Sequence, residues 1–414
     1  MDPAPGTFRI DARDGSARAG VLLCAHGEVE TPAFVPLATS ATVKGLDSAE
    51  VEALGYQMVL GNTFHLFIQP GHALVEQLGG LHEFMAWRRP IITDSGGFQV
   101  FSMGHGSVAA EIKGSRTNER KSRILEISEE GVRFRSYIDG DEKFMGPETS
   151  MEVQAALGSD VALAFDECTP FHVDRDYTAR STERTHRWLD RCVEWHAAHA
   201  PAGQMLYGIV QGGVYEDLRV ASAERVASAS VAGVAVGGSL GQEKAQMREV
   251  VEWALRPVPV EKPRHLLGIG DVDDILASVA AGIDTFDCAT PTRLARHGSA
   301  LVPDPQGRWR LDLAKSRWRE SQDPIVDGCP CPACGGGAGS SGYSRAYLHY
   351  LIKAGELTAK RLLTLHNLTF MALLMDGVRA AIRAGRLEQY SRQVLAGDGP
   401  YGQAPGAAPT AGAA

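Results

Sequence analysis

This chain of 414 residues lacks two features of membrane and secreted proteins. No apolar run approaches the ~18 residues that a membrane span requires. The amino terminus, MDPAPGTFRIDARDG, has neither the basic start nor the apolar stretch of a secretory signal. We therefore expect no membrane association and a cytoplasmic location.

An excess of positive charge is also missing. The chain has 41 Lys and Arg residues against 50 Asp and Glu residues, a formal net charge of −9. This balance argues against binding of a polyanion over the whole surface, although a local basic stripe would still attract one.

Cysteines are few, and an odd total of seven does not form a disulfide framework in the cytoplasm. Three of them, Cys329, Cys331 and Cys334, lie within six residues and need one further Cys or His ligand to hold a tetrahedral Zn²⁺. The candidates are His349 and His366, and we favour His366 because the packing of the helical stretch 356–375 would fix its imidazole. Four protein ligands leave no open position for water. We therefore predict one structural zinc ion per chain.

A zinc deaminase is the rival interpretation of the cysteines. Cys331 and Cys334 match its P-C-x-x-C half, and His26-Gly27-Glu28 supplies an H-x-E half. In that class the two halves normally lie close together in one compact unit. Here the whole apparent barrel separates them, and Cys329 is left unexplained.

Short apolar or β-branched runs alternate with amphipathic helical stretches such as 178–199, 216–230 and 243–255. This rhythm predicts parallel strands joined by crossover helices. Chemically suggestive residues follow several different strands, which favours a closed (β/α)8 TIM barrel over a doubly wound open sheet. The eight expected strands are Phe34–Ala38, Met58–Leu60, Ile91–Thr93, Ala162–Phe165, Leu206–Val210, Gly233–Val236, His265–Ile269 and Asp284–Cys288.

Several stretches depart from this rhythm and define the expected domains. Residues 7–32 look like a hairpin lid ahead of the barrel, and residues 103–145 look like an insertion with a long loop and a second hairpin. We expect a catalytic barrel over 1–298 and 367–395, an inserted zinc-binding subdomain over 299–366, and a disordered tail over 396–414.

Two carboxylates stand at expected strand ends. Asp94 begins the DSGG turn after the third strand, and Asp287 ends the eighth. Alone, DSGG is a common turn, but a pair of strand-end carboxylates suits displacement at a sugar anomeric carbon, with one nucleophile and one general acid/base. Asp166, Gln211 and the backbone around Gly238 add donors and acceptors that could read the edge of a purine.

Basic residues outnumber acidic ones seven to three in the stretch after Asp287. A solvated face is the plain interpretation, and a phosphate-binding stripe is the functional one. The basic residues are Arg293, Arg296, Arg308, Arg310, Lys315, Arg317 and Arg319.

Several motifs in one order over residues 7–395 resemble those of the bacterial-type tRNA-guanine transglycosylase family. They are GNTFHL (61–66), DSGGFQVFS (94–102), FDECTP (165–170), YGIVQGG (207–213), GG (237–238), LLGIG (266–270), FDCATPTR (286–293), the cysteine cluster, SRAYLH (344–349) and TLHN (364–367). The resemblance implies a (β/α)8 barrel with a zinc-binding insertion. It also implies exchange of guanine for the 7-deazaguanine preQ1 at the wobble position of tRNAs with GUN anticodons, in queuosine biosynthesis. A homodimer is expected.

The resemblance assigns roles residue by residue. Asp287 matches the nucleophile that attacks C1′ and leaves a covalent tRNA–enzyme intermediate, and Asp94 matches the acid/base. The zinc ligands match Cys329, Cys331, Cys334 and His366, whereas His349 matches a position that is not a ligand. Positions that hold the base match Ser95, Asp166, Gln211 and the Gly238 amide, and Phe98 matches the position that stacks on it.

The chain departs from the family pattern at residues 239–243, which read SLGQE where bacterial relatives typically have LAVGE. The insertion at 103–125 and the GGGAGSSG stretch before Ser344 are longer than usual. Cys168 favours preQ1 over the bulkier queuine, although Gly241 would leave room for a larger base.

Other functions stay open at this point. A queuine-salvaging transglycosylase or a non-catalytic tRNA-binding partner subunit would share the fold, but a partner subunit would tolerate loss of Asp94 and Asp287. The archaeal-type exchanger is expected to carry a further carboxyl-terminal RNA-binding domain. A glycosidase explains the carboxylates but not the cysteine cluster.

Overall fold

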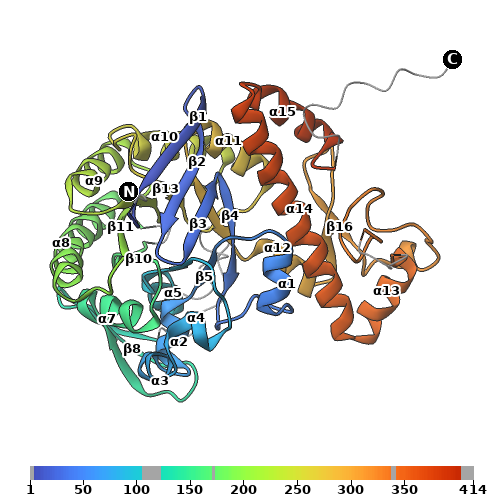
Figure 1. Ribbon diagram of the computed structural model, residues 1–414. Helices are drawn as coiled ribbons and strands as arrows, with labels where there is room; N and C mark the ends of the chain where they lie inside the picture. The colour runs from blue at the N-terminus through green and yellow to red at the C-terminus, as the bar shows by residue number, and fades with distance from the viewer. Residues whose placement is uncertain (1–3, 105–122, 170–172, 337–341, 402–414) are drawn as a thin grey trace.

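The computed structural model describes residues 4–104, 123–169, 173–336 and 342–401. Eight parallel strands close into a barrel, which confirms the predicted fold class and all eight expected strands to within a few residues (Figure 1). Around the barrel they are β4 (Ala33–Ala38), β5 (Val59–Gly61), β6 (Ile91–Thr93), β10 (Val161–Leu163), β11 (Met205–Val210), β12 (Gly233–Val236), β13 (Arg264–Leu266) and β14 (Thr285–Cys288).

Helices follow the strands and cover the outside of the barrel, as the 3.6-residue apolar period predicts (Figure 1). The long helix α8 starts one turn earlier than expected because Asp174 caps it, accepting a hydrogen bond from the Tyr177 amide. The barrel helices include α1 (Ser48–Ala53), α2 (Thr63–Ile68), α3 (His72–Gln77), α4 (Gly80–Phe84), α5 (Gly97–Gly104), α7 (Pro147–Leu157), α8 (Arg175–His199), α9 (Glu216–Ser228), α10 (Lys244–Leu255), α11 (Val272–Ala281) and α12 (Thr290–Arg296).

The amino-terminal stretch forms three antiparallel strands, so the expected hairpin is extended by one strand. They are β1 (Phe8–Asp14), β2 (Ala17–Cys24) and β3 (Gly27–Thr31). Leu22, Cys24 and Val29 of this sheet join the apolar side chains that fill the barrel interior. Arg18 pairs with Asp284, just before β14, at 2.5 Å. The sheet therefore closes the amino end of the barrel and leaves the carboxyl ends of the strands for the site.

The insertion after α5 contains a second antiparallel sheet, β7 (Ile124–Ile127), β8 (Val132–Arg135) and β9 (Glu142–Met145). Strands β8 and β9 are the hairpin expected within 103–145. The long loop of the insertion carries four basic residues in sequence, and they lie outside the described residues: Lys113, Arg116, Arg120 and Lys121.

The carboxyl-terminal part surrounds the cysteines and then returns to the barrel. Its elements are β15 (Ser299–Leu301), β16 (Arg310–Asp312), the 3-10 turn η1 (Ser316–Trp318), α13 (Arg345–Ala354), α14 (Leu357–Arg383), α15 (Leu387–Gln393) and the π-helical turn η2 (Val394–Asp398). Helix α14 carries His366 in its first half and packs against β1, β2 and β4, so one helix crosses the proposed boundary at 366/367. That division stays a prediction.

The chain is ordered beyond the start of the tail expected at residue 396. Val394 is buried, and the Tyr401 ring lies 5.9 Å from that of Phe370, so apolar side chains hold this segment. The rest of the tail, 402–414, lies outside the described residues. None of the described helices is long and apolar enough to cross a bilayer.

Candidate active site and metal centre

Asp94 follows β6 and is held by the turn that begins α2. The Thr63 amide donates to Asp94 Oδ1 at 2.9 Å, and the Asn62 and Gln99 side-chain amides donate to Oδ2. Burial raises the pKa of Asp94 to about 7; the Thr63 amide opposes this shift and the charge of Asp287 adds to it. A carboxyl group with this pKa can both give and take a proton near neutral pH.

Asp287 lies near the carboxyl end of β14 and is buried. His265 Nε2 and the Gly268 amide lie 3.1 Å from its Oδ1 atom. Strand β13 ends at Leu266 rather than at Ile269, because the chain turns there and brings the Gly268 amide to the carboxylate. The barrel thus brings the two predicted carboxylates to the same end, from strands far apart in sequence.

The residues expected to hold a base form one hydrogen-bonded group. Ser95 Oγ donates to Asp166 Oδ1 at 2.7 Å, and Gln211 Nε2 donates to Asp166 Oδ2 at 2.6 Å. Burial raises the pKa of Asp166 to about 6, against the lowering effect of these two donors. Gln211 Oε1 is buried and accepts no hydrogen bond from the described residues.

Gly238 lies against Gln211 with φ +73°. A Cβ atom there would overlap Gln211 Oε1 and lie 3.1 Å from Cδ, so the close approach of this backbone requires glycine. Phe98, by contrast, lies outside this group in the first turn of α5 with 38% of its surface exposed. An exposed ring at this end of the barrel is available to a ligand.

Arg219 on α9 is a site residue that the sequence did not reveal. Its guanidinium is fully buried and donates to the carbonyls of Val210, Gly213, Gly237 and Ser239 at 2.7–3.0 Å. It therefore ties the loop after β11 to the loop after β12. Its partners are backbone carbonyls, which have no sequence signature. The only signal in the sequence would be the position of Arg219 on the apolar, inward face of its helix.

The three cysteines meet His366 in one cluster. The Sγ atoms of Cys329, Cys331 and Cys334 lie 3.6, 3.4 and 3.4 Å from His366 Nδ1. These distances match the ~3.5 Å edge of a tetrahedron with Zn–S near 2.3 Å and Zn–N near 2.0 Å. His366 Nε2 donates to the Leu301 carbonyl at 2.8 Å, which leaves the lone pair of Nδ1 facing the sulfurs. The cluster fits a structural metal ion.

His349, the other candidate ligand, lies outside this cluster, since its Nδ1 bonds the Leu313 carbonyl at 2.8 Å. His26, required by the deaminase interpretation, lies instead beside His82 and Asp160 at the amino end of the barrel. The two imidazoles are stacked with centroids 3.6 Å apart. Stacked rings cannot both direct in-plane lone pairs at one ion, so we assign this group to hydrogen bonding. The deaminase interpretation is wrong.

All seven basic residues of the stripe after Asp287 are exposed. Arg308 lies 3.4 Å from Asp304, Lys315 lies 3.7 Å from Asp312, and Arg319 lies 3.1 Å from Glu320. Within the described ranges, no carboxylate pairs with Arg293, Arg296, Arg310 or Arg317. Two of them have hydroxyl partners instead, since Arg293 donates to Thr290 Oγ1 and Arg296 donates to Thr292 Oγ1, each at 3.2 Å.

The fold and site define a class: a (β/α)8-barrel protein with carboxylates gathered at the carboxyl end of the barrel and a Cys3His cluster that could hold a metal ion. The profile of the family described as "Queuine tRNA-ribosyltransferase" matches residues 13–399. The chain belongs to this family and is accordingly a pentosyltransferase, which confirms the resemblance to tRNA-guanine transglycosylases.

Individual relatives agree over nearly the full length. A protein named Queuine tRNA-ribosyltransferase from Roseiflexus sp. (strain RS-1) is 49% identical over 391 residues, covering 92% of this chain and 96% of the relative. Proteins of the same name from Pelotomaculum thermopropionicum and Solidesulfovibrio magneticus are 46% and 44% identical, covering 94% and 95% of this chain and 98% of each relative.

Proposed function

We propose that this protein exchanges guanine for preQ1 at the wobble position of tRNAs with GUN anticodons, as a step of queuosine biosynthesis. The observation that carries the proposal is the pairing of Asp94 and Asp287 at one end of the barrel, next to a group suited to a purine edge. The names of the relatives support tRNA as the substrate.

The proposed chemistry is a double displacement at C1′. An Asp287 oxygen forms a bond to C1′ while the C1′–N9 bond breaks, and the departing guanine takes the electron pair and a proton from Asp94. In the second step N9 of the incoming base attacks C1′, the C1′–oxygen bond breaks, and its electron pair returns to the Asp287 carboxylate. The proton released from the incoming base returns to Asp94. The raised pKa of Asp94 supports this role, because the group must be protonated in one step and ionised in the next.

Base recognition in this proposal rests on Asp166 and its two donors. An ionised Asp166 accepts from the N–H groups of a guanine-like edge, and the Gly238 amide and Gln211 supply donors for its carbonyl oxygen. The buried, unpaired Gln211 Oε1 suits a further ligand N–H group. Ser95 orients the carboxylate, and Phe98 stacks on the base.

We propose Zn²⁺ as the ion in the Cys3His cluster, because three thiolates and one imidazole at tetrahedral spacing are its preferred ligands. It would hold β15 and α14 to the cysteine loop and supply no chemistry to the exchange. The unpaired arginines of the stripe would hold tRNA phosphates. A tRNA substrate also supports the expected cytoplasmic location.

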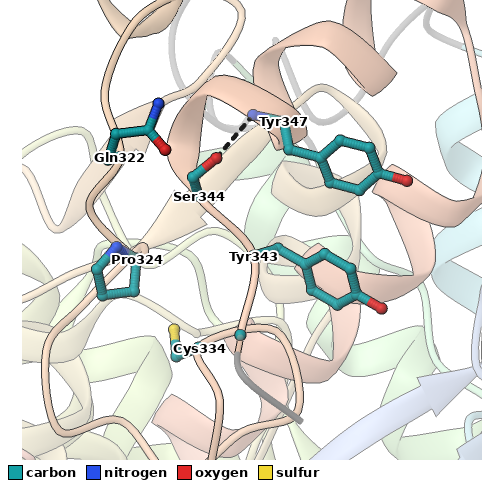
Figure 2. A pocket seen from close by; sticks show the side chains of 7 residues that line it. Gln322, Pro324, Cys334, Tyr343, Ser344 and Tyr347 are labelled. Atoms are coloured by element: carbon teal, nitrogen blue, oxygen red, sulfur yellow. Dashed lines mark hydrogen bonds between the residues drawn. The ribbon is translucent and has the colours of Figure 1, made fainter.

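We propose a homodimer on the basis of exposed aromatic side chains at α13. Tyr343, Tyr347 and Tyr350 are 37%, 43% and 64% exposed, and the first two rings stack with centroids 5.5 Å apart. Figure 2 shows Tyr343 and Tyr347 pointing the same way beside a cavity of about 530 Å³ that Cys334 also lines. Exposed aromatic groups of this kind are enriched in interfaces. Tyr347→Ser with Tyr350→Ser should yield monomers in sedimentation velocity, and a dimer unchanged in this variant would place the interface elsewhere.

The function is tested by exchange of radiolabelled guanine into defined tRNA transcripts, with preQ1 and queuine as competitors. We expect exchange only in transcripts with GUN anticodons and stronger competition by preQ1. Stronger competition by queuine would instead assign the salvage activity, and no exchange in any transcript would favour a non-catalytic partner subunit.

A further inference from the structure

His265 on β13 lies next to the proposed nucleophile, in a place that the proposed chemistry does not yet use. In the parallel register His265 is opposite Thr285, so Asp287, two residues further along β14, points to the same side of the sheet. His265 is 0% exposed. Its Nδ1 atom lies 2.9 Å from Thr285 Oγ1, and its Nε2 atom lies 3.1 Å from Asp287 Oδ1.

These contacts fix the proton positions on a neutral imidazole. A carboxylate only accepts hydrogen bonds, so Nε2 carries the proton and donates it to Asp287 Oδ1. Nδ1 then holds the lone pair, which accepts a hydrogen bond from the Thr285 hydroxyl. Both ring nitrogens are thereby satisfied inside the protein.

The two carboxylate oxygens of Asp287 differ in their hydrogen-bond donors. Oδ1 receives two donors, His265 Nε2 and the Gly268 amide, each at 3.1 Å. Oδ2 has no hydrogen-bond donor in the part of the chain that the structure describes. An oxygen without a donor has both lone pairs available and is the stronger nucleophile.

We propose that His265 is a positioning residue that, together with the Gly268 amide, engages Oδ1 of Asp287 and thereby assigns Oδ2 as the atom that bonds to C1′. This inference rests on the proposed function, in which Asp287 forms the glycosyl ester. Thr285 completes the arrangement by fixing the tautomer of His265.

The two hydrogen bonds favour one half-reaction over the other. In the free enzyme Oδ1 carries part of the carboxylate charge, and in the ester it is a neutral carbonyl oxygen. Hydrogen bonds to a charged acceptor are stronger than those to a neutral one. His265 therefore stabilises the free carboxylate relative to the ester, which restrains the first displacement and helps Asp287 to leave in the second.

His265→Phe removes the donor while keeping a planar ring of similar size. The adduct with a GUN-anticodon RNA stem-loop is measured on denaturing gels, at equilibrium over a range of guanine concentrations and in single-turnover rates of formation and resolution. We expect the guanine concentration that halves the adduct to rise about five- to tenfold, because loss of the donor slows guanine-driven resolution and does not slow adduct formation. Thr285→Val should raise this guanine concentration as well, but by less. The His265 tautomer that donates from Nε2 then loses the Thr285 hydroxyl that stabilises it.

His265→Gln serves as the rescue, because its side-chain amide places an N–H group near the position of Nε2. In this variant we expect the guanine concentration that halves the adduct to stay within about twofold of the value for the unmodified protein. Equal slowing of formation and resolution in His265→Phe, or the same balance in the Phe and Gln variants, would overturn the inference and leave His265 a packing residue. A failure of the proposed function is a separate result: the unmodified protein would then form no adduct.

Discussion

The close approach of Gly238 to Gln211 allows a sharp test of the base-reading group. In Gly238→Ala the new Cβ overlaps the Gln211 side-chain amide, and the residue keeps a left-handed φ of +73°. The backbone conformation costs about 1–2 kcal/mol for alanine. Displacement of Gln211 also breaks its 2.6 Å hydrogen bond to Asp166, worth about 1.5–3 kcal/mol for a charged acceptor.

Gly355→Ala is the matched control. Gly355 follows α13 with φ +77°, and a Cβ there would meet nothing within 4 Å. Both variants carry the strain of the left-handed backbone and the lower entropy of an alanine in the unfolded chain. Only Gly238→Ala displaces Gln211.

We expect urea denaturation to show that Gly238→Ala lowers the free energy of unfolding by about 2.5–5 kcal/mol, against about 1–2 kcal/mol for Gly355→Ala. The KM for guanine should rise by at least about tenfold in Gly238→Ala alone. Equal stability losses together with an unchanged KM would refute the assignment of Gly238 and Gln211 to the base.

Three further outcomes follow from the titration, the metal cluster and the basic stripe. Burial raises the pKa of Asp94 from 3.8 to about 7, so the folded protein holds this proton longer and its free energy of unfolding falls as pH rises through that window. Relative to the unmodified protein, Asp94→Asn should therefore gain about 1–3 kcal/mol between pH 4 and pH 7.5 in denaturation curves, and an equal difference at both pH values would contradict the shift. Cys331→Ser should lower both the metal content, near one zinc per chain by mass spectrometry, and the melting temperature; full metal retention would show that its sulfur is not a ligand. Arg310→Ala with Arg317→Ala should flatten the salt dependence of tRNA binding by roughly 0.7–0.9 log units per lost phosphate contact. Arg308→Ala should change this salt dependence less, because the Arg308 guanidinium already pairs with Asp304. An unchanged salt dependence in the double variant would show that the stripe is a solvated face.

The barrel could be predicted from the sequence because each strand is a short apolar run followed by a helix of clear period. That repetition also places Asp94, Asp166 and Asp287 at strand ends, and a closed barrel brings all such ends together. The Cys3His cluster was predictable for a similar reason, since three ligands lie within six residues.

The residues that support the site could not be predicted in the same way. His265 is one polar residue in a buried strand, and its contact with Asp287 depends on the register of β13 against β14. Arg219 resembles an ordinary surface charge on an amphipathic helix, and its partners are carbonyls of any residue type. Likewise, the tail composition around residue 396 indicates disorder, but Val394 is buried and Tyr401 packs against the apolar core, including Phe370.

The central claim, that Asp287 forms a covalent bond to the tRNA ribose, is tested most directly by trapping the adduct on denaturing gels. The unmodified protein should give an adduct with a GUN-anticodon RNA that disappears when guanine is added in excess. Asp287→Asn should give none while binding the RNA within about tenfold of the unmodified affinity, because an amide is a poor nucleophile and the phosphate contacts remain. An adduct formed by Asp287→Asn would contradict the account.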